Sequence, residues 1–328
     1  MARTLAQEQN LPKMPSMPAT PPRLTSRRIG IHTSIAGGVE TAAQRAYRLG
    51  CNTFQIFSSS PRQWQPYKLT REQCRVMTEL RARYDLKPLV IHASYLLNLA
   101  ASNPVFYEKT IAAFRGEVER AQALGAEYLV VHPGSFRGAS REEGLARAAH
   151  AITEATRGLD LAGAGLTLLL ENTAGAEYSL GGSFEQVAAL VAVLRAIIPA
   201  AACMDTCHIH VAGYDIISDQ GYQATLKHID ETIGLKHIPV WHCNDAKAKF
   251  GSRLDRHQHI GAGTMGLEPF RRLLNDPRLK HAAFIAETPI DAPGDDQRNV
   301  EALKALVADR VPRPRRPARI QTKCSQKV

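Results

Sequence analysis

The sequence predicts an α/β protein built as a single (β/α)8 TIM barrel with a tail at each end. The chain has 328 residues, of which 44% are hydrophobic, enough for one barrel of roughly 250 residues. Short apolar runs alternate with longer segments of helical periodicity, as in βαβ units with a parallel sheet. Eight such runs occur along the chain. Eight parallel strands of this kind close into a barrel.

The eight apolar runs are the expected strands, each buried on both faces. They read RIGIHTS (28–34), CNTFQIF (51–57), PLVIHAS (88–94), EYLVVHP (127–133), LTLLLEN (166–172), AACMDTC (201–207), PVWHCND (239–245) and AAFIAET (282–288). A doubly wound open sheet is the main alternative. No GxGxxG follows the first run to favour it.

The segments between the strands favour helices. Apolar residues recur at three- and four-residue intervals in 71–86, 107–125, 141–161 and 184–198. Gly50 and Gly125 stand just before strands, where a helix that leads into a strand commonly ends on glycine.

The two ends differ in composition from the middle. Residues 1–28 hold five Lys or Arg against one Glu, and residues 310–328 hold seven Lys or Arg and no acid. The ends thus carry +11, while the whole chain carries +10, so residues 29–309 are near −1. We expect a barrel domain over 28–308 between disordered basic tails at 1–27 and 309–328. Such tails either attract phosphates without regard to sequence or only aid solubility.

Composition also bears on the compartment. No run of about 18 apolar residues occurs, and the first residues lack the apolar centre of a secretory signal. The six cysteines form no CxxC pair, which indicates a reducing compartment without structural disulfides. We expect a soluble cytoplasmic protein with no membrane partner, associated with the nucleoid in a bacterial cell. Nothing demands more than a monomer.

Side chains that bind metals recur where the expected strands end. In a (β/α)8 barrel these carboxyl ends, and the loops after them, carry the chemistry. One such histidine is usually structural, but coincidence across six successive strands is not expected. A carboxylate that ends an apolar run also needs a partner, because buried charge is costly. The nine potential ligands are His92, His132, Glu171, Asp205, His208, His242, Asp255, His257 and Glu287.

Five imidazoles and four carboxylates suit Zn²⁺ in an open catalytic site, with Mn²⁺ as a lesser alternative at one site. At three or four protein ligands per ion, nine ligands serve two or three metals if a carboxylate is shared. Clustered divalent ions favour phosphodiester cleavage, because they lower the pKa of bound water to about 7 and neutralise charge on the reacting oxygens. An anionic substrate follows.

Several segments resemble the endonuclease IV family of apurinic/apyrimidinic endonucleases, a resemblance that covers roughly residues 28–308. The segments are IGIHTSIAGG, PRQW, IHASYLLNLA, VVHPGS, ENTAG, MDTCHIHVAGYD, WHCNDAKAKFGSRLDRHQHIGAG and AETP. The resemblance implies a barrel with three zinc ions. It assigns His92, His132 and Glu171 to one ion, Asp205, His242, Glu287 and the shared Glu171 to a second, and His208, Asp255 and His257 to the third.

The implied reaction is hydrolysis of the phosphodiester on the 5′ side of an abasic site in double-stranded DNA, leaving a 3′-hydroxyl and a 5′-deoxyribose phosphate. Trimming of blocked 3′ ends would be the same chemistry at another position. Glu171 would bridge metals and orient the nucleophile.

Recognition of a missing base requires side chains that wedge into the duplex. By the resemblance Arg62, Tyr95 and Leu96, after the second and third strands, look like this wedge. Lys247 and Arg256 could contact phosphates. Each of the five could equally be an ordinary surface or loop-packing residue.

Two further histidines compete with the assigned ligands. His210 and His259 lie two residues beyond His208 and His257, and the register of the motif favours the earlier residue of each pair. His32 stands in a segment that departs from the family's pattern, and we expect it to hydrogen bond at the rim instead of binding metal.

Other classes of protein remain open at this point. A sugar isomerase or epimerase of the xylose isomerase type would use Glu171, Asp205, His242 and Glu287 alone, without the five added ligands or the PRQW and SYLLNLA loops. A damaged-DNA-binding protein that does not cut is the non-enzyme alternative, and the metals could also be purely structural.

Overall fold

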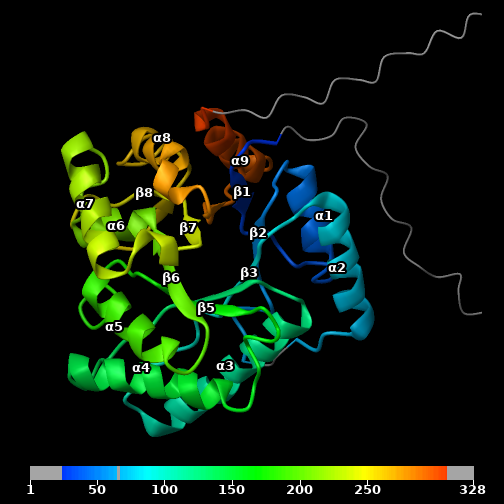
Figure 1. Ribbon diagram of the computed structural model, residues 1–328, viewed down its shortest axis with the longest axis vertical. Coiled ribbons are helices and arrows are strands. Elements are labelled where there is room, and N and C mark those ends of the chain that lie inside the picture. Colours follow the sequence, from blue (N-terminus) through cyan, green and yellow to red (C-terminus); the bar gives the residue numbers. More distant parts are fainter. Residues whose placement is uncertain (1–23, 65–66, 309–328) are drawn as a thin grey trace, which may run out of the picture.

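The computed structural model describes residues 24–64 and 67–308. Eight parallel strands form the central sheet, in the order β1-β10-β7-β6-β5-β4-β3-β2, and helices surround them (Figure 1). A bridge between His32 and Gln55 and a bond from Thr33 N to the Gln55 carbonyl oxygen, 2.8 Å, bring the first and last strands of this order together. The predicted barrel fold is confirmed. Its strands are β1 (Arg28–Ile31), β2 (Phe54–Phe57), β3 (Leu89–His92), β4 (Tyr128–Val131), β5 (Thr167–Glu171), β6 (Ala200–Asp205), β7 (Val240–His242) and β10 (Ala283–Ala286).

Each predicted helical segment contains a helix. Thr70 and Ser140 begin two of them with reciprocal capping bonds, which satisfy backbone N–H groups that have no partner within the helix. Gly50 and Gly125 follow helices with φ of 79° and 62°, the left-handed backbone that glycine adopts freely. The helices are α1 (Thr41–Arg48), α2 (Arg71–Tyr84), α3 (Pro104–Ala123), α4 (Arg141–Thr156), α5 (Phe184–Arg195), α6 (Thr206–Ala212), α7 (Asp219–Thr232), α8 (Glu268–Asn275) and α9 (Asp295–Leu306).

Apolar side chains fill the inside of the barrel below its carboxyl end. This inner cluster is separate from the larger core that packs the strands against the helices. Its members alternate along the strands, because successive side chains of a strand point to opposite faces. They are Val90, Val130, Leu169, Ala201, Cys203, Val240 and Ile285.

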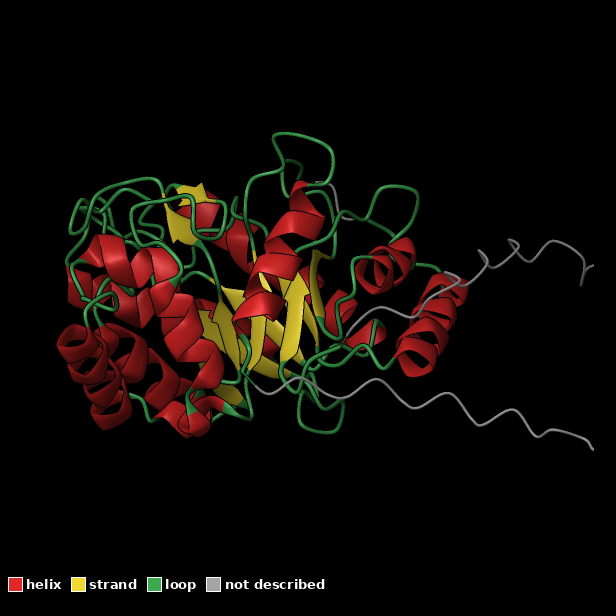
Figure 2. Cartoon of the chain, turned by 90° about the horizontal axis from the view of Figure 1, so that it is seen from above, coloured by secondary structure: helices red, strands yellow, loops and turns green. Residues whose placement is uncertain are grey.

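Two elements after the later strands were not predicted. Helix α6 begins directly after β6, with Asp205 as both the last residue of the strand and the N-cap of the helix. After β7, the short strands β8 (Asp245–Ala246) and β9 (His257–Gln258) pair antiparallel. Figure 2 shows this ladder beyond the end of the barrel strands. His257, expected in a loop, therefore lies on a strand.

The expected tails fall largely outside the described residues, which begin at 24 and end at 308. Residues 24–27, assigned to the first tail by composition, are in contact with the barrel: Thr25 and Arg27 are buried, and Arg27 donates a hydrogen bond to the Asp276 carbonyl oxygen at 2.9 Å. Folded structure thus begins before residue 28. Among the described residues, no helix is both long and apolar enough to cross a membrane.

Gly30 lies where β1 and β2 meet to close the barrel, and a Cβ at this position would collide with the backbone carbonyl of Thr53. We predict that Gly30→Ala lowers the free energy of unfolding by about 1–3 kcal/mol, as overpacking does, measured by thermal or urea denaturation. Gly116→Ala in α3 is the control, because its Cβ would meet only the flexible end of Arg120. Equal stability of the two variants would contradict this account of closure.

Candidate metal centre

The metal-binding side chains form a layer directly above the apolar filling of the barrel. Because strand side chains repeat every two residues, the residue two beyond an inward apolar residue also points inward. His92 follows Val90 in this way, and Glu171 follows Leu169. The same step relates His132, Asp205, His242 and Glu287 to Val130, Cys203, Val240 and Ile285. Six of the nine expected ligands thus share one layer at the end of the barrel.

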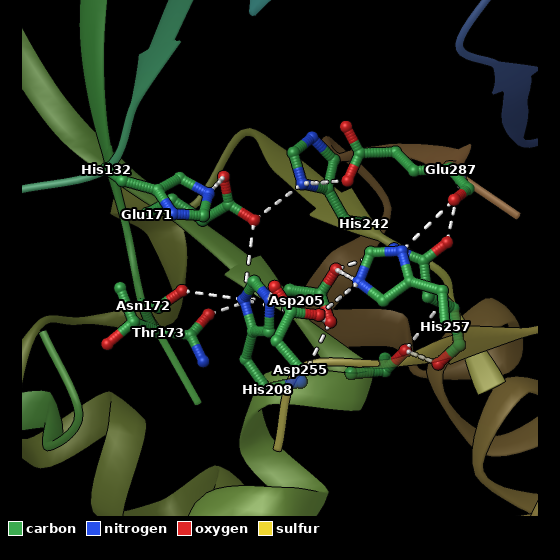
Figure 3. A network of polar contacts seen from close by, with 12 residues as sticks. His132, Glu171, Asn172, Thr173, Asp205, His208, His242, Asp255, His257 and Glu287 are labelled. Carbon is green, nitrogen blue, oxygen red and sulfur yellow. Dashed lines mark hydrogen bonds and ion pairs between the residues drawn. The ribbon is translucent and has the colours of Figure 1, made fainter. Parts of the chain in front are cut away.

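Glu171 lies at the centre of this layer and is fully buried. Its Oε2 is 3.1 Å from His92 Nε2 and 2.9 Å from His132 Nε2. Its Oε1 is 2.9 Å from His242 Nδ1 and 3.6 Å from His208 Nδ1. The two oxygens of one carboxylate therefore face two different groups of imidazoles (Figure 3).

Among the described residues, four groups of ligand atoms are close enough for each to hold one ion. Three of them have the membership expected from the sequence. His92, His132 and Glu171 form one group. Glu171, Asp205, His242 and Glu287 form a second, in which His242 Nδ1 is also 3.2 Å from Glu287 Oε2. The third group consists of His208, Asp255 and His257.

The third group joins α6 to the β8–β9 ladder. Asp255 lies 3.2 Å from His208 Nε2 through one oxygen and 3.2 Å from His257 Nε2 through the other. Both imidazole nitrogens are buried and lack a hydrogen-bond partner. Asp205 accepts a hydrogen bond from His208 N at 2.9 Å. The N-cap of α6 therefore also holds the backbone of His208, one of the three ligands, in place.

Backbone carbonyl groups fix the tautomer of three of the imidazoles. The Nδ1 atoms of His92, His208 and His257 lie 2.7, 2.9 and 3.0 Å from the carbonyl oxygens of Ala93, Asn172 and Glu287. Since a carbonyl only accepts, each Nδ1 donates, and Nε2 is the nitrogen left to face a carboxylate. Two acceptors cannot meet without positive charge between them, so each of these contacts needs either a proton on Nε2 or a metal ion in its place. The residues fit metal ions.

The pKa values of the ligands also show that the carboxylates of the site need positive charge beside them. Burial would lower the pKa of His92, but Glu171 and Glu287 outweigh it and raise this pKa to about 9. Nearby carboxylates likewise outweigh burial at His257, whose pKa rises to about 9. Conversely, the surrounding imidazoles outweigh burial at Glu171 and hold the pKa of this carboxyl well below its usual range.

Cys207, which is buried in the hydrophobic core, also lies within reach of Asp205 and His257 and forms the fourth group with them. Its thiol donates to the Arg256 carbonyl oxygen at 3.7 Å, and burial raises its pKa strongly. Because thiolate is the form that binds metal, this thiol is poorly suited to be a ligand.

The competing histidines lie away from these groups. His210 Nε2 is 3.2 Å from the Thr264 hydroxyl, and His259 Nδ1 is 3.0 Å from Asn299 Nδ2. His32 borders the layer, with Nδ1 3.0 Å from Gln55 Nε2.

Of the residues expected to contact DNA, Tyr95 lines the hollow above the layer. We call this hollow of about 360 Å³ the mouth; it is lined in part by His92, Tyr95, His132, His208 and Asp255. Tyr95 is 61% exposed, and Leu96 is partly buried beside it. Arg62, Lys247 and Arg256 are exposed. The Ser94 hydroxyl donates to the Pro61 carbonyl oxygen at 3.0 Å and so joins the two expected wedge loops.

Two polar residues that orient the ligands were not expected from the sequence. Gln55, fully buried in β2, donates to Glu287 Oε1 at 2.5 Å and accepts from His242 Nε2 at 2.8 Å. Asn244 donates to Asp205 Oδ2 at 2.6 Å and accepts from Glu287 N at 2.7 Å. A glutamine inside the apolar run CNTFQIF was the available signal.

Comparison with known proteins agrees with the fold and the site. Residues 43–307 match the family model described as xylose isomerase-like TIM barrel, so the chain is a barrel of this class. A probable endonuclease 4 of Solibacter usitatus is 48% identical over 291 residues, 88% of this chain and 100% of the relative. A crystal structure of endonuclease IV from Thermus thermophilus, 40% identical, matches with a TM-score of 0.74 over 85% of this chain and 98% of that chain. The chain therefore belongs to the endonuclease IV family.

More distant barrels share only the fold. A D-tagatose 3-epimerase-like protein matches with a TM-score of 0.63 at 21% identity, covering 85% of this chain and 96% of its own.

We predict that Gln55→Leu weakens metal binding about 10- to 100-fold, the usual effect of removing a partner that orients a ligand. Competition with a chelator, followed by elemental analysis, measures the affinity. Gln122→Leu is the control, because that side chain on α3 donates to the Asp160 carbonyl oxygen, away from the metal ligands. Unchanged affinity in a folded Gln55→Leu protein would show that Gln55 does not support the ligands.

The raised pKa values predict how stability depends on pH without metal. His92 and His257 have pKa values near 9 in the folded protein, against 6.5 for an ordinary imidazole. Their protons therefore stabilise the folded state fully below about pH 6.5, and this contribution is lost as the pH rises through about 9. The unfolding midpoint of metal-stripped protein should fall across this window more than that of metal-loaded protein. Parallel curves would refute the assignment.

Proposed function

We propose that this protein is a DNA repair endonuclease that binds three zinc ions, with Mn²⁺ as an alternative at one site. It hydrolyses the phosphodiester 5′ to an abasic site in double-stranded DNA and leaves a 3′-hydroxyl and a 5′-deoxyribose phosphate. One observation carries the proposal: two of the three ligand groups share Glu171, and members of the first and third groups, His92, His132, His208 and Asp255, line one open mouth. A sugar isomerase needs only one of the groups, the one with Asp205, His242 and Glu287.

Unpaired cations around the mouth support a polyanionic substrate. On the outer helices, arginines such as Arg75 and Arg115 pair with carboxylates of their own helix. In the described residues of the rim loops, no carboxylate pairs with Arg62, Lys247 or Arg256. Cations that keep their charge beside a metal centre attract the phosphates of DNA.

The wedge loops support recognition of a missing base. Tyr95 presents its ring to solvent at the edge of the mouth. The Phe57 ring packs against it edge to face, with 6.3 Å between the ring centres. Together with Leu96 and Arg62, Tyr95 offers an apolar surface and a charge close to the proposed reaction centre. Such side chains can fill the space of an absent base and hold the duplex bent.

The chain's own residues determine where the reaction takes place. When bound, divalent cations supply Lewis-acid chemistry that ionises a water near neutral pH and neutralises charge on the phosphate. Glu171 holds the first two ligand groups together through its two oxygens and would orient the attacking water. His208, Asp255 and His257 present the third group across the mouth, on the side where the leaving oxygen would lie.

The remaining parts of the proposal follow from the same site. Blocked 3′ ends would be trimmed by the same groups on a shorter substrate. We propose a monomer that acts on damaged DNA in the cytoplasm, at the nucleoid in a bacterial cell.

The first test is incision of a duplex oligonucleotide with one abasic-site analogue, before and after metal stripping, together with elemental analysis. We expect a cut 5′ to the lesion, about three zinc ions per chain and loss of cutting on stripping. Tight binding without cutting would indicate a damage sensor. If neither occurs, turnover of a ketose sugar would identify an isomerase instead.

Glu171→Gln separates catalysis from binding. The amide keeps the shape of the side chain but removes the charge that both imidazole groups face, so incision should fall by at least about 1,000-fold while the affinity for abasic duplex changes little. Single-turnover cleavage and fluorescence anisotropy measure the two. Full activity in this variant would remove Glu171 from the reaction.

A further inference from the structure

We infer that a groove beside the mouth binds a backbone phosphate of the DNA that flanks the cleaved bond; this rests on the proposed function. We call it the side groove. Its volume is about 430 Å³, and Arg141, Ser183, Gln186 and Arg253 are among its lining residues. None of these residues was expected from the sequence to contact DNA.

The side groove lies next to the mouth and shares lining residues with it. Ala176 and Ser179, in the loop between β5 and α5, line both hollows. On the other side of the mouth, Ser94 and Leu97 line both the mouth and a pocket beneath the wedge loops. A strand with its cleaved phosphodiester at the metal centre would therefore run from the wedge loops, across the ligands, and into the side groove.

Aromatic rings that line the side groove support two arginines without neutralising them, Arg141 in the lining itself and Arg137 next to it. The Arg137 guanidinium lies 5.3 Å from the centre of the Tyr178 ring, and the Arg141 guanidinium lies 6.0 Å from that of Phe136. The two rings pack edge to face at 5.8 Å. Cation–π contact orients a guanidinium while its N–H groups stay free to bind an anion.

Arg253 completes the groove from the segment that joins β8 to β9. Its φ of 58° is unusual for a residue other than glycine and costs free energy. The backbone is held there by a bond from Arg253 N to the Val211 carbonyl oxygen at 2.9 Å. The exposed side chain thus lines the groove from a backbone position that is held in place.

The charges at the side groove favour an anion. Within the described part of the chain, Arg137, Arg141 and Arg253 form no ion pair with a carboxylate, and the polar residues Ser179 and Ser183 line the same groove. Glu177 is the one acid among the lining residues. Guanidinium groups bind phosphate through paired N–H donors, so a phosphodiester is the ligand class that these residues fit.

The test measures DNA affinity and its salt dependence for Arg141→Ala and Arg253→Asn, the latter because asparagine tolerates left-handed backbone. The probe is the metal-loaded full chain with an abasic-analogue duplex. We expect each variant to bind about three- to ten-fold more weakly and to lower the salt slope by about one, as loss of one phosphate contact does. Shortening one arm of the duplex, and not the other, should abolish the difference from wild type.

Arg83→Ala is the matched control. Arg83 is exposed and lies 5.6 Å from the Tyr84 ring centre, but it belongs to the last turn of α2, which leads to the opposite end of the barrel. It should bind as wild type does. If the Arg141 and Arg253 variants match Arg83→Ala in DNA affinity and in salt slope, the side groove does not bind phosphate. If the wild-type protein neither prefers nor cuts abasic duplex, the proposed function is wrong. In that case undamaged duplex still tests the groove, because phosphate contacts do not depend on the lesion.

Discussion

The contact of a single buried carboxylate with several imidazoles is the constraint on which the rest of the site depends. Glu171 has no exposure to water, so its charge must be balanced by groups inside the protein. The barrel provides these groups from the ends of three other strands and from α6, at 2.9–3.6 Å. The imidazoles can do this only with a proton, or a metal ion in its place, between ring nitrogen and carboxylate. The barrel end is therefore complete only when positive charge is present within it.

The apolar filling of the barrel determines where this charge can lie. Because side chains alternate along each strand, the layer of Val90, Leu169 and their neighbours places the next inward residues at one height. The third ligand group needs elements outside the barrel, since no strand end reaches that far across the opening. Helix α6, capped by Asp205, and the β8–β9 ladder bring His208, Asp255 and His257 to it.

Sequence periodicity was sufficient to predict the strands, the helices and the inward ligands, because each depends on local repeats of two or of three to four residues. It was insufficient for residues whose role depends on neighbours far along the chain. Gln55 is an inward residue like His92, but its partners are 187 and 232 positions away, so its place in β2 does not reveal what it touches. The β8–β9 ladder of two residues per strand is likewise too short for a periodic signal.

The formal charge along the chain does not predict which face of the folded protein attracts a polyanion. Residues 29–309 are close to neutral, yet their cations are unequally distributed once the chain folds. Arginines of the outer helices such as Arg75 are neutralised by carboxylates within one turn, whereas Arg137 and Arg141 on the rim are supported by aromatic rings that keep their charge available. A nearly neutral barrel can thus direct a positive field toward one face. Where such pairing occurs on the outer helices it reduces competing positive charge, while the arginines that aromatic rings support at the rim stay available to phosphates.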